Sequence, residues 1–563
     1  MVDDAGDRFS RIDAGCEALA GGGVFPRDVR APRPESSTAH LADWNDLTNT
    51  AEQDRTPACW RRGTSPRGSA LENRGGTGED VDLLSSLECL DPVPDLEHNS
   101  EMTPDLERAS EEASRLFVDI YEKLETRKVD PGIDFKSLVE GFRNTLKSQG
   151  VGLLEALRDF RETILPNSLA IPHPLYLGLV NSSPLPGAAL ADHLISALNN
   201  NDGGLPQPAL ACEEEVIRAF KELFDLPGSW NGLILPGGAF TILQGLLLAR
   251  ANAFPEIEAD GFYSLRGIPR IYTSEAAHFT VTRTAKEIGV GERNVVCVPS
   301  VGRGSIDVRG LEKAVRADRQ KGYLPFAVVA SLGTTGTGAV DPVHAIGGLC
   351  QKEKLWLHID ACYGGAARLV PALRSLFQGI ELADSISIDP HKWFFIPIAA
   401  GLLLTRHRDL ECRVFALGSG SYLPGSPAIY PLWRGIASSR RASGLGIWMA
   451  LRAHGWDTIR GAVEKNIQLI RELEKGLAQN GFDVLADGQL SVACARWQGT
   501  DELQTRIASE IVASGDAWFA TVRFDGRTWL RFNLLNLYTR EDHIQFLVKR
   551  VTETAQRLSR SPS

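Results

Sequence analysis

Residues 385–395 read SISIDPHKWFF, an alternation of serine and isoleucine that ends at Asp389-Pro390 and then presents His391 and Lys392. The apolar, β-branched residues before Asp389 are typical of a buried strand. A lysine after such a strand can simply extend its stem until the amine reaches solvent. Alternatively, the amine is held in a crevice at the strand end, where it can form a Schiff base. These eleven residues leave both interpretations open.

On both sides of this stretch, from about 230 to 405, short apolar runs alternate with amphipathic segments. The apolar runs include GLILPGG, RIYTSEA, NVVCVPSV, FAVVASLGTT, LWLHIDAC and AGLLLTR. This alternation predicts βαβ units and a mostly parallel sheet covered by helices on both faces. Ligands of such sheets bind at the carboxyl ends of the strands. His278, Thr334, Asp360 and Lys392 all stand at or just beyond predicted strand ends.

Composition narrows the classes of protein that the chain can belong to. Its 563 residues are 43% hydrophobic and 23% charged, which is typical of globular proteins, and the net charge of −11 disfavours binding to nucleic acid. The longest apolar stretch, near WFFIPIAAGLLL, is too short to span a membrane. The nine cysteines form no C-x-x-C pair, so a reduced cytoplasmic setting without a metal site is expected.

We predict four regions along the chain. Residues 1–101, rich in Gly, Pro, Ser and Arg, are expected to form a disordered N-terminal extension, and the alternative that the natural chain starts at Met102 stays open. Residues 102–180 carry helical patterns, and 181–444 form the large α/β domain. Residues 445–563 form a small α/β domain that contains a hairpin turning at Asp525-Gly526.

Several motifs at the predicted strand ends suggest chemistry, although each has an ordinary structural alternative. In LPGGAFTILQG, Gly238 opens a helix whose amides could bind phosphate with help from the Thr241 hydroxyl, or the glycines could only form a tight turn. Asp360 ends a buried strand, and its carboxylate either pairs with a cation such as a pyridinium or caps the next segment. His278 could stack on a planar ring or only pack.

The motifs occur together and in a fixed order. LPGGAF, TSEAAHFT, SLGTTGTGAVDP, WLHIDACYGG and DSISIDPHKW resemble the successive motifs of the group II pyridoxal-phosphate-dependent amino-acid decarboxylases. The resemblance runs from about Met102 to near the C-terminus. It implies the fold-type I, aspartate aminotransferase-like architecture, the cofactor pyridoxal 5′-phosphate, and a homodimer with active sites at the subunit interface, on which region 102–180 packs.

The resemblance also implies a role for individual residues. Lys392 would carry the cofactor as a Schiff base and His391 would contact its phosphate. Arg531, in WLRFNLLN, resembles an arginine that holds the substrate α-carboxylate, or it is an ordinary strand residue. The remaining matches are the phosphate turn (Gly238, Ala239, Thr241), the ring-stacking histidine (His278), a threonine near the ring (Thr334) and the ring-nitrogen partner (Asp360).

Residues 415–433, FALGSGSYLPGSPAIYPLW, have the Gly-, Ser- and Pro-rich composition of a mobile lid. Relatives carry a proton-donating tyrosine here, which Tyr430 matches best, with Tyr422 as the second choice. The resulting prediction is decarboxylation of an L-amino acid, aromatic or otherwise uncharged, to an amine and CO2. Two alternatives are a related lyase or oxidative aldehyde synthase, and a catalytically silent homologue that acts as an interaction protein.

Overall fold

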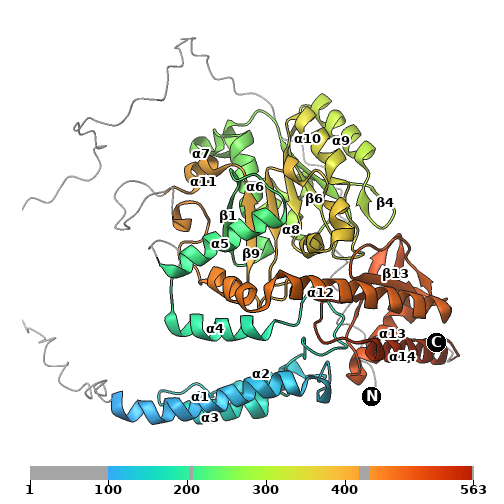
Figure 1. The fold of residues 1–563 in the computed structure, drawn as a ribbon. Coiled ribbons are helices and arrows are strands. Elements are labelled where there is room, and N and C mark those ends of the chain that lie inside the picture. Colours follow the sequence, from blue (N-terminus) through green and yellow to red (C-terminus); the bar gives the residue numbers. More distant parts are fainter. Residues whose placement is uncertain (1–98, 202–206, 417–429, 561–563) are drawn as a thin grey trace, which may run out of the picture. The chain divides into compact units, whose positions relative to one another are not determined.

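The computed structural model describes residues 99–201, 207–416 and 430–560 (Figure 1). The chain divides into two units, Met1–Val93 and Pro94–Ser563, and all described residues belong to the second. The predicted disordered extension therefore lies almost entirely outside the described residues. The alternative that the natural chain starts at Met102 stays open. The first helix, α1, spans Asn99–Glu122 and so begins three residues before the predicted boundary at 102. Pro104 inside it removes only one backbone hydrogen bond.

The large domain is built on a seven-stranded sheet with the strand order β1-β9-β8-β7-β6-β2-β3. Strands β3, β2, β6, β7 and β8 are parallel neighbours, whereas β9 runs antiparallel to both β8 and β1. The mostly parallel sheet predicted from the sequence is therefore confirmed. The strands are β1 (Asn231–Leu235), β2 (Pro269–Ser274), β3 (Val295–Val298), β6 (Leu324–Ser331), β7 (Trp356–Asp360), β8 (Ser385–Ile388) and β9 (Gly401–Thr405).

Helices cover both faces of this sheet. Successive side chains of each strand point to opposite faces, so apolar residues on both faces need a covering layer. On β6, Val328 and Ala330 belong to one apolar core with residues of α5, α9 and α10. Ala327 and Val329 belong to a second core with α6 and α8. These helices are α5 (Pro208–Leu223), α6 (Gly238–Ala253), α8 (Thr280–Glu287), α9 (Val308–Gln320) and α10 (Val343–Glu353).

The carboxyl ends of the central strands meet at one edge of the sheet. In the parallel register, Ser331 of β6 lies beside Asp360 of β7, which in turn lies beside Ser387 of β8. Asp389 follows β8 by one residue, and Lys392 stands in the turn after it. This shared register brings the polar residues of the predicted strand ends into one neighbourhood.

A small domain follows, and its antiparallel sheet has the order β10-β11-β13-β12. The predicted hairpin is confirmed, because Phe524 pairs with Arg527 across Asp525 and Gly526, whose φ angles are +49° and +69°. Two left-handed residues form the turn that suits a two-residue hairpin. Its elements are β10 (Asp483–Val484), β11 (Val492–Arg496), α13 (Asp501–Ser514), β12 (Ala520–Phe524), β13 (Arg527–Asn533) and α14 (Glu541–Arg560).

Helix α12 (Ser443–Gln479) connects the two sheets (Figure 1). It changes direction at Gly455, whose φ of +73° is outside the helical range. Ile447 before the bend packs in the core of the large domain, and Leu473 after it packs in the core of the small domain. The predicted boundary at residue 445 falls near the start of this helix and stays a prediction.

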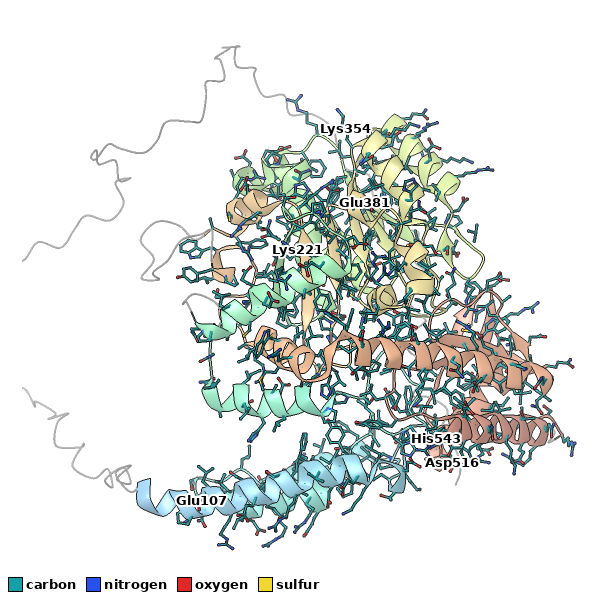
Figure 2. The ribbon with its side chains drawn as sticks, viewed as in Figure 1. Glu107, Lys221, Lys354, Glu381, Asp516 and His543 are labelled. Carbon is teal, nitrogen blue, oxygen red and sulfur yellow. The ribbon has the colours of Figure 1, made fainter. Side chains whose placement is uncertain are left out.

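The other helices lie mostly before the large sheet or in its connections. Near the start of the sheet, Lys221 of α5 (Figure 2) donates from Nζ to the carbonyls of Gly228 and Trp230, 3.1 and 2.8 Å away, and so holds the turn into β1. The remaining elements are η1 (Leu124–Thr126), α2 (Phe135–Phe142), α3 (Leu153–Asp159), η2 (Phe160–Ile164), α4 (Pro186–Leu198), α7 (Ile257–Asp260), η3 (Gly261–Ser264), η4 (Glu292–Asn294), β4 (Ser300–Val301), β5 (Ser305–Ile306), η5 (Gly364–Leu369), η6 (Pro371–Phe377), η7 (Ile380–Leu382), α11 (Arg408–Phe415) and η8 (Pro431–Trp433).

Candidate active site

A cavity of about 640 Å³ lies at the carboxyl edge of the large sheet. The large domain lines it with the start of α6, the start of α8 and the residues before it, and the ends of β6, β7 and β8. The small-domain strands β12 and β13 and the segments 179–181 and 398–399 complete the lining. Its ionisable and polar lining includes His278, Arg283, Thr335, Asp360, Asp389, His391, Lys392 and Arg531. Most of the residues that the sequence analysis selected thus share one cavity, although they are far apart in the chain.

Lys392 points its amine into this cavity, and its nearest charged partner is Asp389. The two are joined by a contact of 3.0 Å between Lys392 Nζ and Asp389 Oδ2, and the aspartate side chain is only 2% exposed. Burial is the largest single influence on the amine and works against its charge, but the negative groups around it, Asp389 first among them, together raise the pKa of Lys392 above the ordinary lysine value. The lysine that the sequence analysis selected is therefore held in the crevice and does not extend to solvent.

The turn before α6 forms a cradle of backbone amides at the same cavity. Gly237, with a φ of +100°, precedes the helix, and Gly238 and Ala239 begin it and line the cavity. The first amides of a helix have no partner within it, so this end can bind an anion. Thr241 does not support the prediction that its hydroxyl faces a phosphate. Its Oγ1 donates to the Gly238 carbonyl at 3.0 Å, and its side chain is buried outside the lining.

Asp360 and His278 line the cavity, as expected. The Asp360 carboxylate is buried and its Oδ1 accepts a hydrogen bond of 3.1 Å from the backbone amide of Cys362. His278 is oriented by a 2.6 Å contact between its Nδ1 and the hydroxyl of Thr280. Burial lowers the pKa of His278, which favours the neutral imidazole and leaves a planar uncharged ring in the cavity. Cys362 packs here as a thiol, because burial raises its pKa well above the ordinary value.

Besides Thr241, two further predicted residues, Thr334 and Tyr430, do not lie in the lining. The Thr334 side chain is buried and closes its own turn, because its Oγ1 accepts from the Ala339 amide at 3.0 Å. Its neighbours Gly333 and Thr335 line the cavity instead, and the sequence analysis missed both. Tyr430 directly precedes η8, whose three residues are buried, and it is not among the lining residues, so its role stays a prediction. Tyr422 lies outside the described residues.

Arg531 of β13 reaches the cavity from the small domain and is 4% exposed. Its Nε donates to the Thr335 carbonyl at 2.8 Å, and Nη1 and Nη2 both donate to the Leu179 carbonyl at 3.1 Å. Leu179 presents this carbonyl from a left-handed backbone, with a φ of +46°. These hydrogen bonds orient the guanidinium. Among the described residues, Arg531 forms no salt bridge with a carboxylate. Arg531 is therefore a buried cation beside the cavity.

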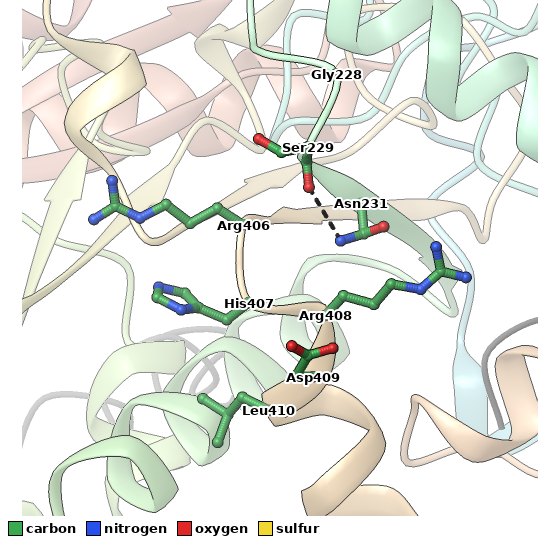
Figure 3. A pocket seen from close by; sticks show the side chains of 8 residues that line it. All are labelled: Gly228, Ser229, Asn231, Arg406, His407, Arg408, Asp409 and Leu410. Atoms are coloured by element: carbon green, nitrogen blue, oxygen red, sulfur yellow. Dashed lines mark hydrogen bonds between the residues drawn. The ribbon is translucent and has the colours of Figure 1, made fainter. Parts of the chain in front are cut away.

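A second cavity, of about 550 Å³, lies at the loop between β9 and α11 (Figure 3). Arg406 and His407 line it, and both contact Asp384, whose Oδ1 lies 2.7 Å from Arg406 Nη2 and 2.9 Å from His407 Nε2. The close view also shows Asn231 donating to Ser229 at 3.4 Å. Because these polar groups satisfy one another, this cavity lacks the convergent reactive groups found at the sheet edge.

The mostly parallel sheet followed by a small C-terminal α/β domain has the fold-type I architecture, and an anion cradle, a buried carboxylate and a lysine meet at its carboxyl edge. The family model described as the pyridoxal-dependent decarboxylase conserved domain matches residues 147–498, which is more than half of the chain. The chain belongs to the pyridoxal-dependent decarboxylases. Its cofactor is pyridoxal 5′-phosphate, and it is a carboxy-lyase that acts on amino acids.

Similar proteins cover most of the chain. An aromatic-L-amino-acid decarboxylase of Bacillus atrophaeus is 27% identical over 80% of this chain and 95% of the relative. An L-2,4-diaminobutyrate decarboxylase of Rhizobium meliloti (strain 1021) is 29% identical over 73% and 84%. A 4-hydroxyphenylacetaldehyde synthase of Rhodiola rosea is 26% identical over 83% and 98%. The crystal structure of Oryza sativa TDC with PLP and tryptamine has a TM-score of 0.77 at 22% identity, covering 81% of this chain and 98% of that one.

Proposed function

We propose that this cavity binds pyridoxal phosphate through the residues that the sequence analysis selected and decarboxylates an uncharged, preferably aromatic, L-amino acid. When bound, the cofactor supplies an aldehyde for an amine and a ring that accepts electrons. Gly238, Ala239 and His391 hold the phosphate, and Lys392 provides the amine. Asp360 keeps the ring nitrogen protonated, and the neutral ring of His278 stacks on the cofactor.

Arg531 holds the α-carboxylate of the substrate in this proposal. Its guanidinium is buried, lines the cavity and is oriented by three hydrogen bonds to backbone carbonyls. A buried cation is stabilised by an anion that enters its site. The fixed position of Arg531 relative to Lys392 would then decide which bond at the α-carbon is broken.

The apolar part of the lining carries the proposal for the substrate side chain. Leu179, Phe240, Phe279 and Ile398 line the cavity mouth. The exposed cation Arg283 is paired there with Glu287, at 2.9 Å, which leaves little attraction for an acidic side chain. Of the two lining carboxylates, Asp360 is assigned to the ring nitrogen and Asp389 already contacts Lys392, so a second ammonium, as in 2,4-diaminobutyrate, would lack its own counterion. An aromatic side chain fits this lining best.

The test is CO2 release from a panel of L-amino acids by the cofactor-loaded protein. The panel contains tryptophan, tyrosine, phenylalanine, 2,4-diaminobutyrate, glutamate and cysteine sulfinate. We expect the largest kcat/KM with an aromatic substrate. A larger kcat/KM with 2,4-diaminobutyrate or glutamate would contradict the proposed substrate class and leave the decarboxylase family intact.

We further propose that the chain forms a homodimer with active sites at the subunit interface. Helix α4 exposes Leu190, Leu194 and Leu198, which are 51%, 46% and 60% accessible and lie four residues apart on one face. Phe279 and Ile398 at the cavity mouth are 69% and 64% accessible as well. Burial of both groups against a second subunit would remove this apolar surface from water and close the cavity.

Analytical ultracentrifugation tests the dimer. We expect Leu194→Glu to shift the protein towards monomer, because the charge would be buried in the interface. Tyr263→Glu is the matched control, since Tyr263 is fully exposed on η3 and should leave the dimer unchanged. A wild-type monomer at micromolar concentration would contradict the proposal.

A cytoplasmic location is part of the same proposal. It is supported by four described cysteines that form no disulfide, Cys297, Cys350, Cys362 and Cys494. Within the described ranges, none of the helices combines the length and apolar composition that crossing a bilayer requires. Cell fractionation of the untagged protein is the test.

A further inference from the structure

Asp389 is a second buried carboxylate in the cavity, and the roles proposed above leave it without a function. It follows β8 directly and is 1% exposed. Its Oδ2 contacts Lys392 Nζ at 3.0 Å, whereas its Oδ1 is buried and has no hydrogen-bond partner among the described residues. A buried carboxylate needs a cation or several donors. Lys392 is therefore its main partner in this structure.

The same carboxylate lies directly beneath the anion cradle. A Cβ atom placed on Gly238 would come within 2.6 Å of Asp389 Oδ2, so the first turn of α6 approaches the carboxylate closely. The positive end of the helix dipole favours a negative group at this position. A phosphate bound by the same amides would place a second anion close to Asp389. Two neighbouring anions repel each other unless a cation lies between them.

The imidazole of His391 also faces this carboxylate. Its Nδ1 donates to the Ala400 carbonyl at 2.7 Å, which leaves Nε2 directed towards Asp389 Oδ2 at 3.8 Å. The Asp389 carboxylate thus faces both the lysine amine and the imidazole of His391. Through Oδ2 it can contact either of them.

We propose that Asp389 is the positioning residue for Lys392, an inference that rests on the proposed function. It holds the ammonium in the cavity of the cofactor-free chain and interacts with His391 once the amine has reacted. An amine reacts with an aldehyde only through its free electron pair, so the ammonium must first release a proton. Asp389 therefore sets the pH range in which Lys392 becomes reactive.

The groups that face Lys392 decide whether its reactive range moves to higher or lower pH. Burial disfavours the ammonium and would move the reactive range of the lysine to lower pH, whereas the carboxylates favour the ammonium and move it to higher pH. Asp389 is the carboxylate in direct contact. The other titratable groups around the amine are Asp360 and Cys362 at the end of β7, His278 before α8, and His391. The substitution Asp389→Asn removes the negative charge nearest to the amine and should therefore lower the pKa of Lys392.

The experiment measures the reactivity of Lys392 in the cofactor-free dimer. The protein is pulsed with acetic anhydride between pH 6 and 11, and acetylation of each lysine is quantified by mass spectrometry. Exposed Lys354 in the same digest is the internal reference. In the wild type we expect the midpoint for Lys392 to lie above that of Lys354. A midpoint below that of Lys354 would overturn the proposal, because burial would then dominate.

Variants at position 389 provide the second measurement. We expect Asp389→Asn to lower the Lys392 midpoint by at least one pH unit, which makes the amine about tenfold more reactive at pH values below the midpoint. Asp389→Glu keeps the charge and should keep the wild-type midpoint. A faster plateau rate in the Asn variant without a shifted midpoint indicates only a looser cavity and would overturn the proposal. The wild-type midpoint decides the matter alone if the Asn variant does not fold.

A further measurement distinguishes a failure of the proposed function from a failure of the role proposed for Asp389. Pyridoxal phosphate is added to the wild type, the product is reduced with borohydride, and the modified lysine is identified by mass spectrometry. If a lysine other than Lys392 carries the cofactor, the proposed site is wrong. If Lys392 carries it while the acetylation midpoints of wild type and Asp389→Asn coincide, only the role of Asp389 is wrong.

Discussion

The ends of β7 and β8 are neighbouring regions with the same kind of residue and different surroundings. Asp360 ends β7, and its Oδ1 accepts the amide of Cys362. Asp389 follows β8, and its Oδ2 contacts the amine of Lys392 while its Oδ1 has no hydrogen-bond partner within the described part of the chain. Both carboxylates line the same cavity. Strand-end position therefore brings a carboxylate to the site, and its immediate partners decide what it can do there.

This difference separates two roles in catalysis. A carboxylate oriented by a backbone amide is available to a ligand as a fixed negative charge, which suits the ring nitrogen of the cofactor. A carboxylate paired with the reactive amine acts on the lysine before the cofactor arrives. The chemical step should consequently be sensitive to Asp360, and the loading of the cofactor should be sensitive to Asp389.

Lys392→Ala should have the largest effect on turnover. Without the amine the cofactor has no covalent attachment and product release loses its nucleophile, so CO2 release should fall to background. The fold should persist, because Asp389 would lose a partner but His391 remains near it. Circular dichroism checks the fold. Decarboxylation near the wild-type rate would refute the assignment of the lysine.

Asp360→Asn should lower kcat by about 10²-fold or more at saturating cofactor, because it removes a preorganised charge from the reacting ring. Asp389→Asn, measured under the same conditions, should lower kcat by less than about tenfold, since its effect is on the lysine before loading. Similar losses in kcat for the two variants would show that the two strand ends are not functionally distinct.

Gly238→Ala should weaken cofactor binding by about tenfold. The new methyl group would lie 2.6 Å from Asp389 Oδ2 and 2.8 Å from Cys362 Sγ, and overpacking of this kind costs about 1–3 kcal/mol. The Kd for pyridoxal phosphate, from absorbance titration, is the measurement. Gly348→Ala in α10 is the matched control, because its methyl group would meet no atom within 4 Å. Equal Kd values for the two variants would count against the close approach of α6 to Asp389.

The smallest expected change concerns the identity of the product. Removal of the proton-donating phenol should leave consumption of the substrate largely intact but divert the reaction, with oxygen as the oxidant, to aldehyde, ammonia and hydrogen peroxide in place of the amine. Tyr430→Phe and Tyr422→Phe are compared by measuring amine and peroxide together. We expect one of the two to switch product. If the wild type itself makes mainly aldehyde, it is an aldehyde synthase, the activity by which its Rhodiola rosea relative is named.

The sequence predicted the sheet and most of the cavity because strand-end residues are encoded by local pattern. His278, Asp360, His391 and Lys392 were all selected from short motifs, and all four line the cavity. Thr241 and Thr334 do not line the cavity, because a threonine hydroxyl can bond to nearby backbone instead of facing a ligand, and their roles stay predictions. In both cases the hydroxyl bonds within its own turn, to Gly238 and to Ala339.

Local pattern in the sequence by itself determined the order of strands and helices, the hairpin at Asp525-Gly526 and the position of Lys392 in a motif that resembles those of the family. Only the tertiary structure decided which side chains meet. Arg531 bonds to the carbonyl of Leu179, 352 residues earlier in the chain, and Asp389 lies beneath Gly238 of a helix that begins about 150 residues before it. Hydrophobic periodicity is local and can be read along the chain, whereas hydrogen bonds and ion pairs at a site depend on packing between distant elements.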